Sequence, residues 1–220
     1  MKTMWIGPEL RALIADRLEG YQRRQLPAGS LKKAAVALIV TDFRNQANLD
    51  GIGEQEQEQA SLILTRRSGS INNHAGQWAL PGGRLEKGEG PAETALREVW
   101  EEIGLQLTTG HVLGILDDYV TRSGYHITPV VIWGGAISHL AGNGAEVVSI
   151  HRIPFPEFLR DDAPWLESGI DSSRPVLYMP VGSTWVASPT AAMLYQFREV
   201  VLLGRNTAVH HFDQPRFAWK

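Results

Sequence analysis

The chain has 220 residues, the length of one large domain or of one domain with extensions. Its 21 lysines and arginines are outnumbered by 24 aspartates and glutamates, so the formal net charge is −3. This balance lacks the basic excess that proteins coating nucleic acid usually carry, and we expect no nucleic-acid partner. The sequence contains no cysteine, which excludes disulfides, zinc–thiolate sites and cysteine nucleophiles.

The hydrophobic pattern gives no sign of a membrane segment. Residues 1–20 contain no continuous apolar run of signal-peptide length, because Arg11, Asp16 and Glu19 interrupt it. No stretch elsewhere reaches the roughly 20 apolar residues that span a bilayer. We therefore expect a cytoplasmic protein with no membrane partner.

The N-terminal part predicts one helix and one strand. Leu10, Ile14 and Leu18 recur at helical spacing, which predicts an amphipathic helix from Pro8 to Arg24. After a break rich in proline and glycine, the apolar run over residues 33–40 predicts a buried strand.

Residues 50–59 are rich in glycine, glutamate and glutamine. Such a segment has little apolar surface to bury, so we interpret it as a loop. An acidic recruitment patch is the alternative. Beyond it, short apolar runs predict strands over residues 61–65, 77–80, 112–119, 125–134 and 145–153.

Helices are predicted among and after these strands. The central one runs from Pro91 to Ile103, and Gly104 supplies its stop signal. Residues 153–159 predict a turn into a short helix, residues 161–185 an irregular segment, and Pro189 to Leu203 a closing helix. Strands on both sides of a central helix indicate one α/β domain over residues 1–220, with a catalytic core at about 34–160 between outer helices at about 8–24 and 189–203. We expect these outer helices to form either a homodimer interface or the outer layer of the fold.

One segment carries the chemistry. It has the pattern G-x5-E-x7-R-E-U-x-E-E-x-G-U, where U is a bulky apolar residue, and it runs from Gly83 to Leu105. Random matching of nine such positions is on the order of one in a million per chain, which excludes an ordinary solvated acidic helix. Glu98, Glu101 and Glu102 stand at i, i+3 and i+4, so we expect them on one helix face.

Three carboxylates this close repel one another unless a cation neutralises them. Their hard oxygen atoms suit Mg²⁺ or Mn²⁺. Arg97 is expected on another face of the helix, where it would orient a carboxylate such as Glu89.

The segment resembles the Nudix box, the signature of the Nudix hydrolases, with every position filled. This resemblance implies an α/β/α sandwich with a mixed β-sheet and hydrolysis of a nucleoside diphosphate linked to another group. It implies a Mg²⁺ or Mn²⁺ site held by Glu98, Glu101 and Glu102, with Arg97 and Glu89 in support.

Further segments are similar to the coenzyme A pyrophosphatase branch of that superfamily. They are Ile63–Ser68, Gly76 and Pro81–Gly83 before the box, and residues 121–131, Glu146–Val147 and Ile153–Pro154 after it. Asn72 stands where the branch pattern has an arginine, and Leu80 where it has an aromatic residue. These departures concern recognition of coenzyme A and leave the metal chemistry untouched.

The remaining candidates surround the box. Arg66, Arg67 and Arg84 are candidate phosphate contacts, because a guanidinium group can bind a phosphate through two hydrogen bonds. For the first two, a structural role is the alternative. His74 would either donate to the diphosphate or be satisfied by loop backbone, and Glu146 would either complete the metal site or act as general base.

The double glycine, Gly82 and Gly83, frees the backbone of the loop before the box helix. Asp117 and Asp118 are interpreted as turn acids. Residues 121–124 would form a loop over the substrate or a plain hairpin connection.

The leading hypothesis is a metal-dependent pyrophosphohydrolase acting on coenzyme A or acyl-coenzyme A. The products would be phosphopantetheine, or its acyl form, and adenosine 3′,5′-bisphosphate. Its first alternative keeps the chemistry and changes the substrate to ADP-ribose, a dinucleotide or a damaged nucleotide. A second alternative is a Nudix-fold module that senses a nucleotide without cleaving it.

Overall fold

The computed structural model describes residues 4–44, 49–68, 76–169 and 173–219. Four α-helices are found there: α1 (Pro8–Glu19), α2 (Pro91–Ile103), α3 (Phe155–Phe158) and α4 (Thr190–Gln196). The strands of the large sheet are β1 (Lys32–Asp42), β2 (Ala60–Arg67), β3 (Trp78–Ala79), β4 (Gly82–Arg84), β5 (Val112–Ile115), β6 (Tyr119–Val120), β7 (Tyr125–Gly135) and β8 (Val147–Pro154).

Within these described ranges, one mixed sheet has the main path β3–β2–β1–β7–β5. β4 also pairs with β1, β6 with β7, and β8 with β2. β1 runs parallel to β7 and antiparallel to β2 and β4. The centre of β1 is apolar and almost continuously buried, as a strand covered on both faces requires.

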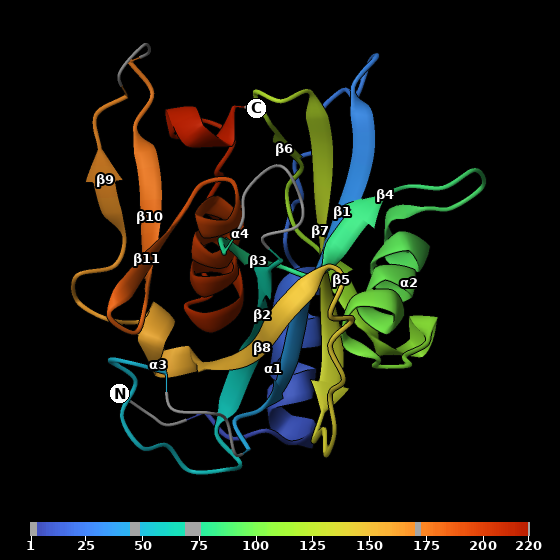
Figure 1. Ribbon diagram of the computed structural model, residues 1–220, viewed down its shortest axis with the longest axis vertical. Coiled ribbons are helices and arrows are strands. Elements are labelled where there is room, and N and C mark those ends of the chain that lie inside the picture. Colours follow the sequence, from blue (N-terminus) through green and yellow to red (C-terminus); the bar gives the residue numbers. More distant parts are fainter. Residues whose placement is uncertain (1–3, 45–48, 69–75, 170–172, 220) are drawn as a thin grey trace.

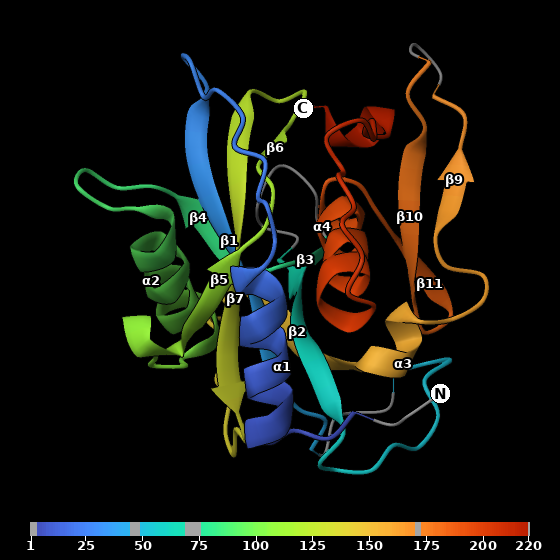
Figure 2. The ribbon, with the colours of Figure 1, turned by 180° about the vertical axis from the view of Figure 1, so that it is seen from behind.

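Helices cover both faces of the sheet (Figures 1 and 2). On one face, α2 buries Ala95, Val99 and Ile103 against alternate residues of β1 and β7. On the other face, α1 and α4 pack in a larger core that includes Ile14 and Leu194. This is the α/β/α layering that the sequence predicts.

The first helix ends at Glu19, earlier than the predicted Arg24. The following segment is held extended by two buried acids, because Arg23 pairs with Asp118 at 2.5 Å and the backbone N–H of Arg24 donates to Asp117. The same acids interrupt the predicted strand 112–119, which is divided into β5 and β6. Both acids lie in the connection between β5 and β6, where they are buried and bonded to the segment after α1.

The C-terminal part holds more strand than the sequence predicts. Residues 161–185 were expected to be irregular, but a three-stranded antiparallel sheet begins there. Its strands are β9 (Trp165–Glu167), β10 (Val176–Val181) and β11 (Thr184–Ala187). The closing helix is α4, which continues as a π-helical segment over Phe197–Leu202, and a 3₁₀ turn covers Arg216–Ala218.

Across the parts of the chain that the structure describes, no helix has the length and apolar character needed to cross a membrane.

Candidate functional site

Helix α2 places the glutamates of the motif beside the double glycine. It starts after Gly90, whose N–H donates to the carboxylate of Glu93, and it ends at Gly104 in the left-handed conformation. Its apolar face is buried in the sheet, so the neighbouring acidic face lies along the β1–β4 edge. Local sequence therefore sets both the position and the orientation of the glutamates.

Gly83 allows the closest approach in the site. A Cβ atom built at Gly83 would lie 2.1 Å from Oε1 of Glu98. Only glycine leaves room for that carboxylate against the backbone of β4. Burial raises the pKa of Glu98, Arg97 opposes this effect, and Glu101 and Glu146 add to it.

Glu102 is the most deeply buried acid of the motif, with 5% of its surface exposed. Burial, followed by the charge of Glu98, raises its pKa to about 8. The charge of Arg67 and the backbone N–H of Gly82 act in the opposite direction, and Glu146 adds to the rise. Without a cation, burial and the neighbouring carboxylates therefore favour the protonated form of Glu102.

Arg97 binds Glu89, as expected, and it also binds Glu98 and Glu101, although it was expected on another face of the helix. Its guanidinium donates to Glu89 at 2.9 Å, to Glu98 at 2.8 Å and to Glu101 at 3.0 Å. Glu89 also accepts the N–H of Glu86, and these bonds, led by that of Arg97, lower its pKa to about 2. Arg97 and Glu89 form a brace between the loop and the helix.

Glu101 lies apart from the buried acids. Its side chain is 51% exposed, and its carboxylate pairs with Arg97 one turn earlier. The structure therefore places Glu98 and Glu102 in the interior of the site and Glu101 at its solvent-exposed edge, the rim of the site.

Glu146 and Arg67 approach the glutamates of α2 from the turn before β8 and from the end of β2. Arg67 pairs in register with Val147, and the N–H of Ser68 donates to the carbonyl of Glu146 at 2.9 Å. Glu146 is exposed in the turn before β8, and its charge acts on both buried glutamates. These residues are distant in sequence and are joined by the β2–β8 pairing.

The other candidate phosphate contacts have separate environments. Arg66 stacks on Trp78, with its guanidinium carbon 3.8 Å from the ring centroid, and donates to the carbonyl of Gly76. Arg84 donates to the hydroxyl of Tyr125 at 3.0 Å. His74 and Asn72 lie outside the described residues.

A divalent cation fits the donor set. In the described ranges, no group of three or more histidine, aspartate or glutamate side chains is arranged closely enough to bind a metal ion as it stands. The carboxylates of Glu98 and Glu101 are turned toward Arg97. All the donors are hard carboxylate oxygens, and a bound cation would stabilise the ionised form of Glu102, which burial and the charge of Glu98 disfavour.

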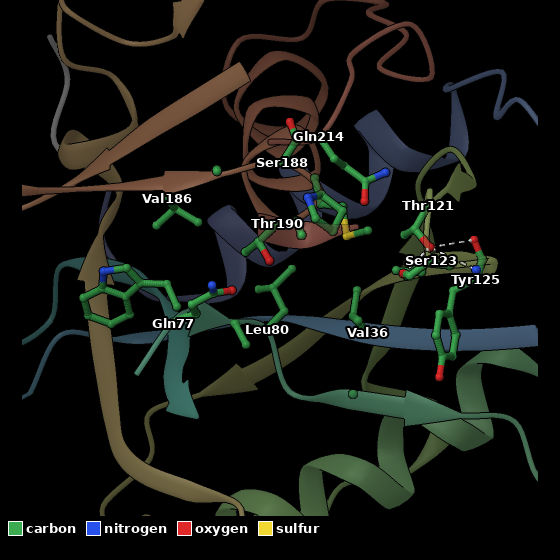
Figure 3. Close-up of a pocket in the computed structure, with 18 of the residues that line it drawn as sticks. Val36, Gln77, Leu80, Thr121, Ser123, Tyr125, Val186, Ser188, Thr190 and Gln214 are labelled. Carbon is green, nitrogen blue, oxygen red and sulfur yellow. Dashed lines mark hydrogen bonds between the residues drawn. The ribbon is translucent and has the colours of Figure 1, made fainter. Parts of the chain in front are cut away.

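A pocket of about 720 Å³ opens beside this site (Figure 3). Gly82, Gly83, Arg67 and Arg84 line its near end. Its other wall comes from β10, β11, α4 and the last turn of the chain, which the sequence reading did not connect with the motif. No local signal could have found this wall, because it lies about 100 residues beyond the motif.

The model of the NUDIX domain matches residues 32–170, more than half of the chain. The chain is therefore a member of the NUDIX domain family. A Nudix hydrolase named NudL, from Yersinia pestis (strain Pestoides F), is 40% identical over 102 residues, which are 46% of this chain and 51% of that protein. The chain thus spans about half the length of the curated relatives it matches.

A solved structure of a MutT/nudix family protein shares the fold. A MutT/nudix family protein from Enterococcus faecalis aligns with a TM-score of 0.54 and 16% sequence identity, over 82% of this chain and 66% of that one. At this identity the likeness concerns the fold alone. A MutT protein from Methanosarcina mazei Go1 aligns with a TM-score of 0.42 and 22% identity, over 63% of this chain and 83% of the other.

Proposed function

We propose that this chain is a divalent-metal-dependent pyrophosphohydrolase that cleaves a nucleoside diphosphate linked to another group. The observation that carries the proposal is the pair Glu98 and Glu102 on α2: Glu102 is buried, and Glu98 lies so close to Gly83 that a Cβ atom there would clash with its carboxylate. Membership of the NUDIX domain family supports it independently. A purely nucleotide-sensing module would have no need for such a destabilising set of acids.

The glutamates of α2 would hold Mg²⁺ or Mn²⁺, with Glu98 and Glu102 as the buried ligands and Glu101 at the rim. Such an ion, when bound, neutralises phosphate charge and lowers the pKa of a coordinated water. Arg97 and Glu89 hold the loop and helix in register, which keeps Glu98 against Gly83. Glu146 would accept a proton from the attacking water or complete the ligand set.

Arg67 would orient the diphosphate. It lines the pocket and its charge acts on Glu102, so it lies between the two regions. A guanidinium in that position binds two phosphate oxygens at once. Arg84, at the same end of the pocket, would supply a second contact. Arg66 is engaged with Trp78 and would support the loop rather than the phosphate.

Within this chemistry we favour coenzyme A or its acyl derivatives as the substrate. The support is the similarity of residues 63–83 and 121–131 to the coenzyme A pyrophosphatase branch. Cleavage would yield phosphopantetheine, or its acyl form, and adenosine 3′,5′-bisphosphate.

The test compares hydrolysis of coenzyme A, ADP-ribose and NADH by the purified chain in excess Mg²⁺ or Mn²⁺, with products identified by chromatography. The proposal expects metal-stimulated release of adenosine 3′,5′-bisphosphate from coenzyme A at the highest kcat/KM. Faster cleavage of ADP-ribose or NADH would reject coenzyme A as the preferred substrate and support the same hydrolytic reaction on the other nucleotide. Nucleotide binding without metal-stimulated cleavage of any of the three would favour the sensing module.

A further inference from the structure

The far wall of the pocket is built by a segment that the family match does not cover. The NUDIX match ends at residue 170, whereas Tyr178, Val186, Thr190 and Gln214 all line the pocket. Figure 3 shows Gln214 across the open space from Val36 of β1, and Thr190 across it from Leu80. The C-terminal segment therefore encloses whatever extends from the double glycine.

Charge is confined to one end of this pocket. Among its described lining residues, Arg67 and Arg84 are the only charged side chains, and both stand at the double-glycine end. The C-terminal wall offers apolar and aromatic surface, including that of Trp185 and Phe217, together with neutral amide and hydroxyl groups. Phosphates are favoured at the arginine end, and an uncharged group is favoured beyond it.

Gln214 has an unused hydrogen-bond acceptor in this wall. The residue is 3% exposed, and its Oε1 has no hydrogen-bond partner among the described residues. The hydroxyl of Tyr119 donates to the carbonyl of Phe212 at 2.9 Å, so its oxygen is left to accept from the Gln214 amide nitrogen. That bond fixes the amide with its nitrogen toward Tyr119 and leaves Oε1 free for another donor.

The backbone around Gln214 is held firmly. Its N–H donates to Asp213 at 2.8 Å, and its carbonyl accepts from the indole of Trp219 at 2.8 Å. Asp213 in turn pairs with Arg122 in the turn between β6 and β7. This turn also contributes Thr121 and Ser123 to the pocket, so the Arg122–Asp213 pair joins the segment of Gln214 to another part of the pocket lining. A buried acceptor that is unpaired yet rigidly placed is a costly feature without a ligand.

We propose that the C-terminal wall is a subsite for an uncharged, amide-bearing chain attached to the diphosphate, with Gln214 as a specificity-determining residue that accepts an amide N–H. This inference rests on the proposed function, because the chain is the second group of the diphosphate substrate. Apolar parts of the chain would lie against Val186 and the aromatic side chains near the opening. Nucleotides whose second group is charged fit this wall poorly.

The test measures equilibrium binding of 4′-phosphopantetheine by calorimetry, in EDTA and without substrate turnover, with ribose 5-phosphate as the comparison probe. Wild-type protein is expected to bind 4′-phosphopantetheine more tightly. Gln214→Leu is expected to raise its Kd by about 3- to 10-fold, the effect of one neutral hydrogen bond. Ala187→Phe, which narrows the same wall, is expected to weaken 4′-phosphopantetheine more than ribose 5-phosphate.

Gln196→Leu is the matched control. Gln196 is also buried, but its side chain bonds to Tyr21, Thr207 and Asp117, and it does not line the pocket. This change should lower stability and leave the Kd unchanged. Equal binding of the two probes, or wild-type Kd values in both Gln214→Leu and Ala187→Phe, would overturn the subsite.

Hydrolysis is assayed separately on the same proteins. Metal-stimulated cleavage of coenzyme A with no selective binding of 4′-phosphopantetheine would reject the subsite and keep the proposed function. Selective binding of 4′-phosphopantetheine with no cleavage of any diphosphate would reject the proposed function and retain the binding subsite.

Discussion

Gly82 and Gly83 are adjacent, yet a methyl group at each should have opposite consequences. At Gly83 the added Cβ would lie 2.1 Å from Oε1 of Glu98, the flexible end of a side chain. At Gly82 it would lie 2.4 Å from the carbonyl oxygen of Ala35 and 2.7 Å from the Cα of Val36, which are backbone atoms of β1. Side chains can retreat, whereas a central strand cannot.

The magnitude follows from these contacts. Contacts shorter than 3.0 Å are essentially absent for real Cβ atoms, so in Gly83→Ala the Glu98 carboxylate must move by close to 1 Å. A displacement of about 1 Å at a reacting centre costs about 100-fold in rate. Gly82→Ala forces the backbone apart and should destabilise the fold by about 1–3 kcal/mol, the range for overpacking.

The assay pairs urea unfolding with metal-stimulated hydrolysis of the best diphosphate substrate. Gly83→Ala should unfold like the wild type and lose about 100-fold in kcat. Gly53→Ala is the control, since its Cβ would meet nothing within 4 Å. Near-normal kcat in Gly83→Ala, or equal destabilisation by Gly82→Ala and Gly83→Ala, would refute the assigned position of Glu98.

Two further predictions concern ion pairs. The pKa of Glu89 is lowered from 4.5 to about 2, so the stabilisation from its ionised form is complete above pH 4.5 and is lost as the pH falls toward 2. In Glu89→Gln the free energy of unfolding should therefore depend less on pH across that window. An unchanged pH dependence in urea titrations would contradict the stabilising bond between Glu89 and Arg97. Arg152 pairs with Asp42 at 2.5 Å, and both groups are buried. Arg152→Met should therefore lower the free energy of unfolding, measured in urea, by about 3–5 kcal/mol. A loss below about 1 kcal/mol would show that the pair contributes little to stability.

The box helix was predictable because its information is local. Helical spacing places Glu98 and Glu102 one turn apart, and Gly104 ends the helix. The apolar run of β1 likewise predicted a buried central strand. Residue spacing alone did not predict the partners of Arg97. Its position on the helix lies next to the glutamate face, and its side chain is long enough to reach both Glu98 and Glu101.

Features that form by contact between segments distant in the sequence could not be predicted from the sequence alone. Asp117 and Asp118 look like turn acids, but they are buried because the segment after α1 supplies Arg23 and backbone N–H groups to them. The C-terminal sheet pairs short strands that have weak individual patterns, such as the three residues of β9. Gln214 acquires its place only when the chain end packs on the start of β10.

The central claim, that buried carboxylates of α2 support metal-dependent diphosphate cleavage, is tested most directly by Glu102→Gln. This change prevents the most buried acid of the motif from ionising and preserves its shape. We expect the variant to keep the wild-type circular dichroism spectrum and thermal transition while losing at least about 100-fold in Mg²⁺- or Mn²⁺-stimulated hydrolysis. A folded Glu102→Gln protein with near-normal metal-stimulated turnover would contradict the account.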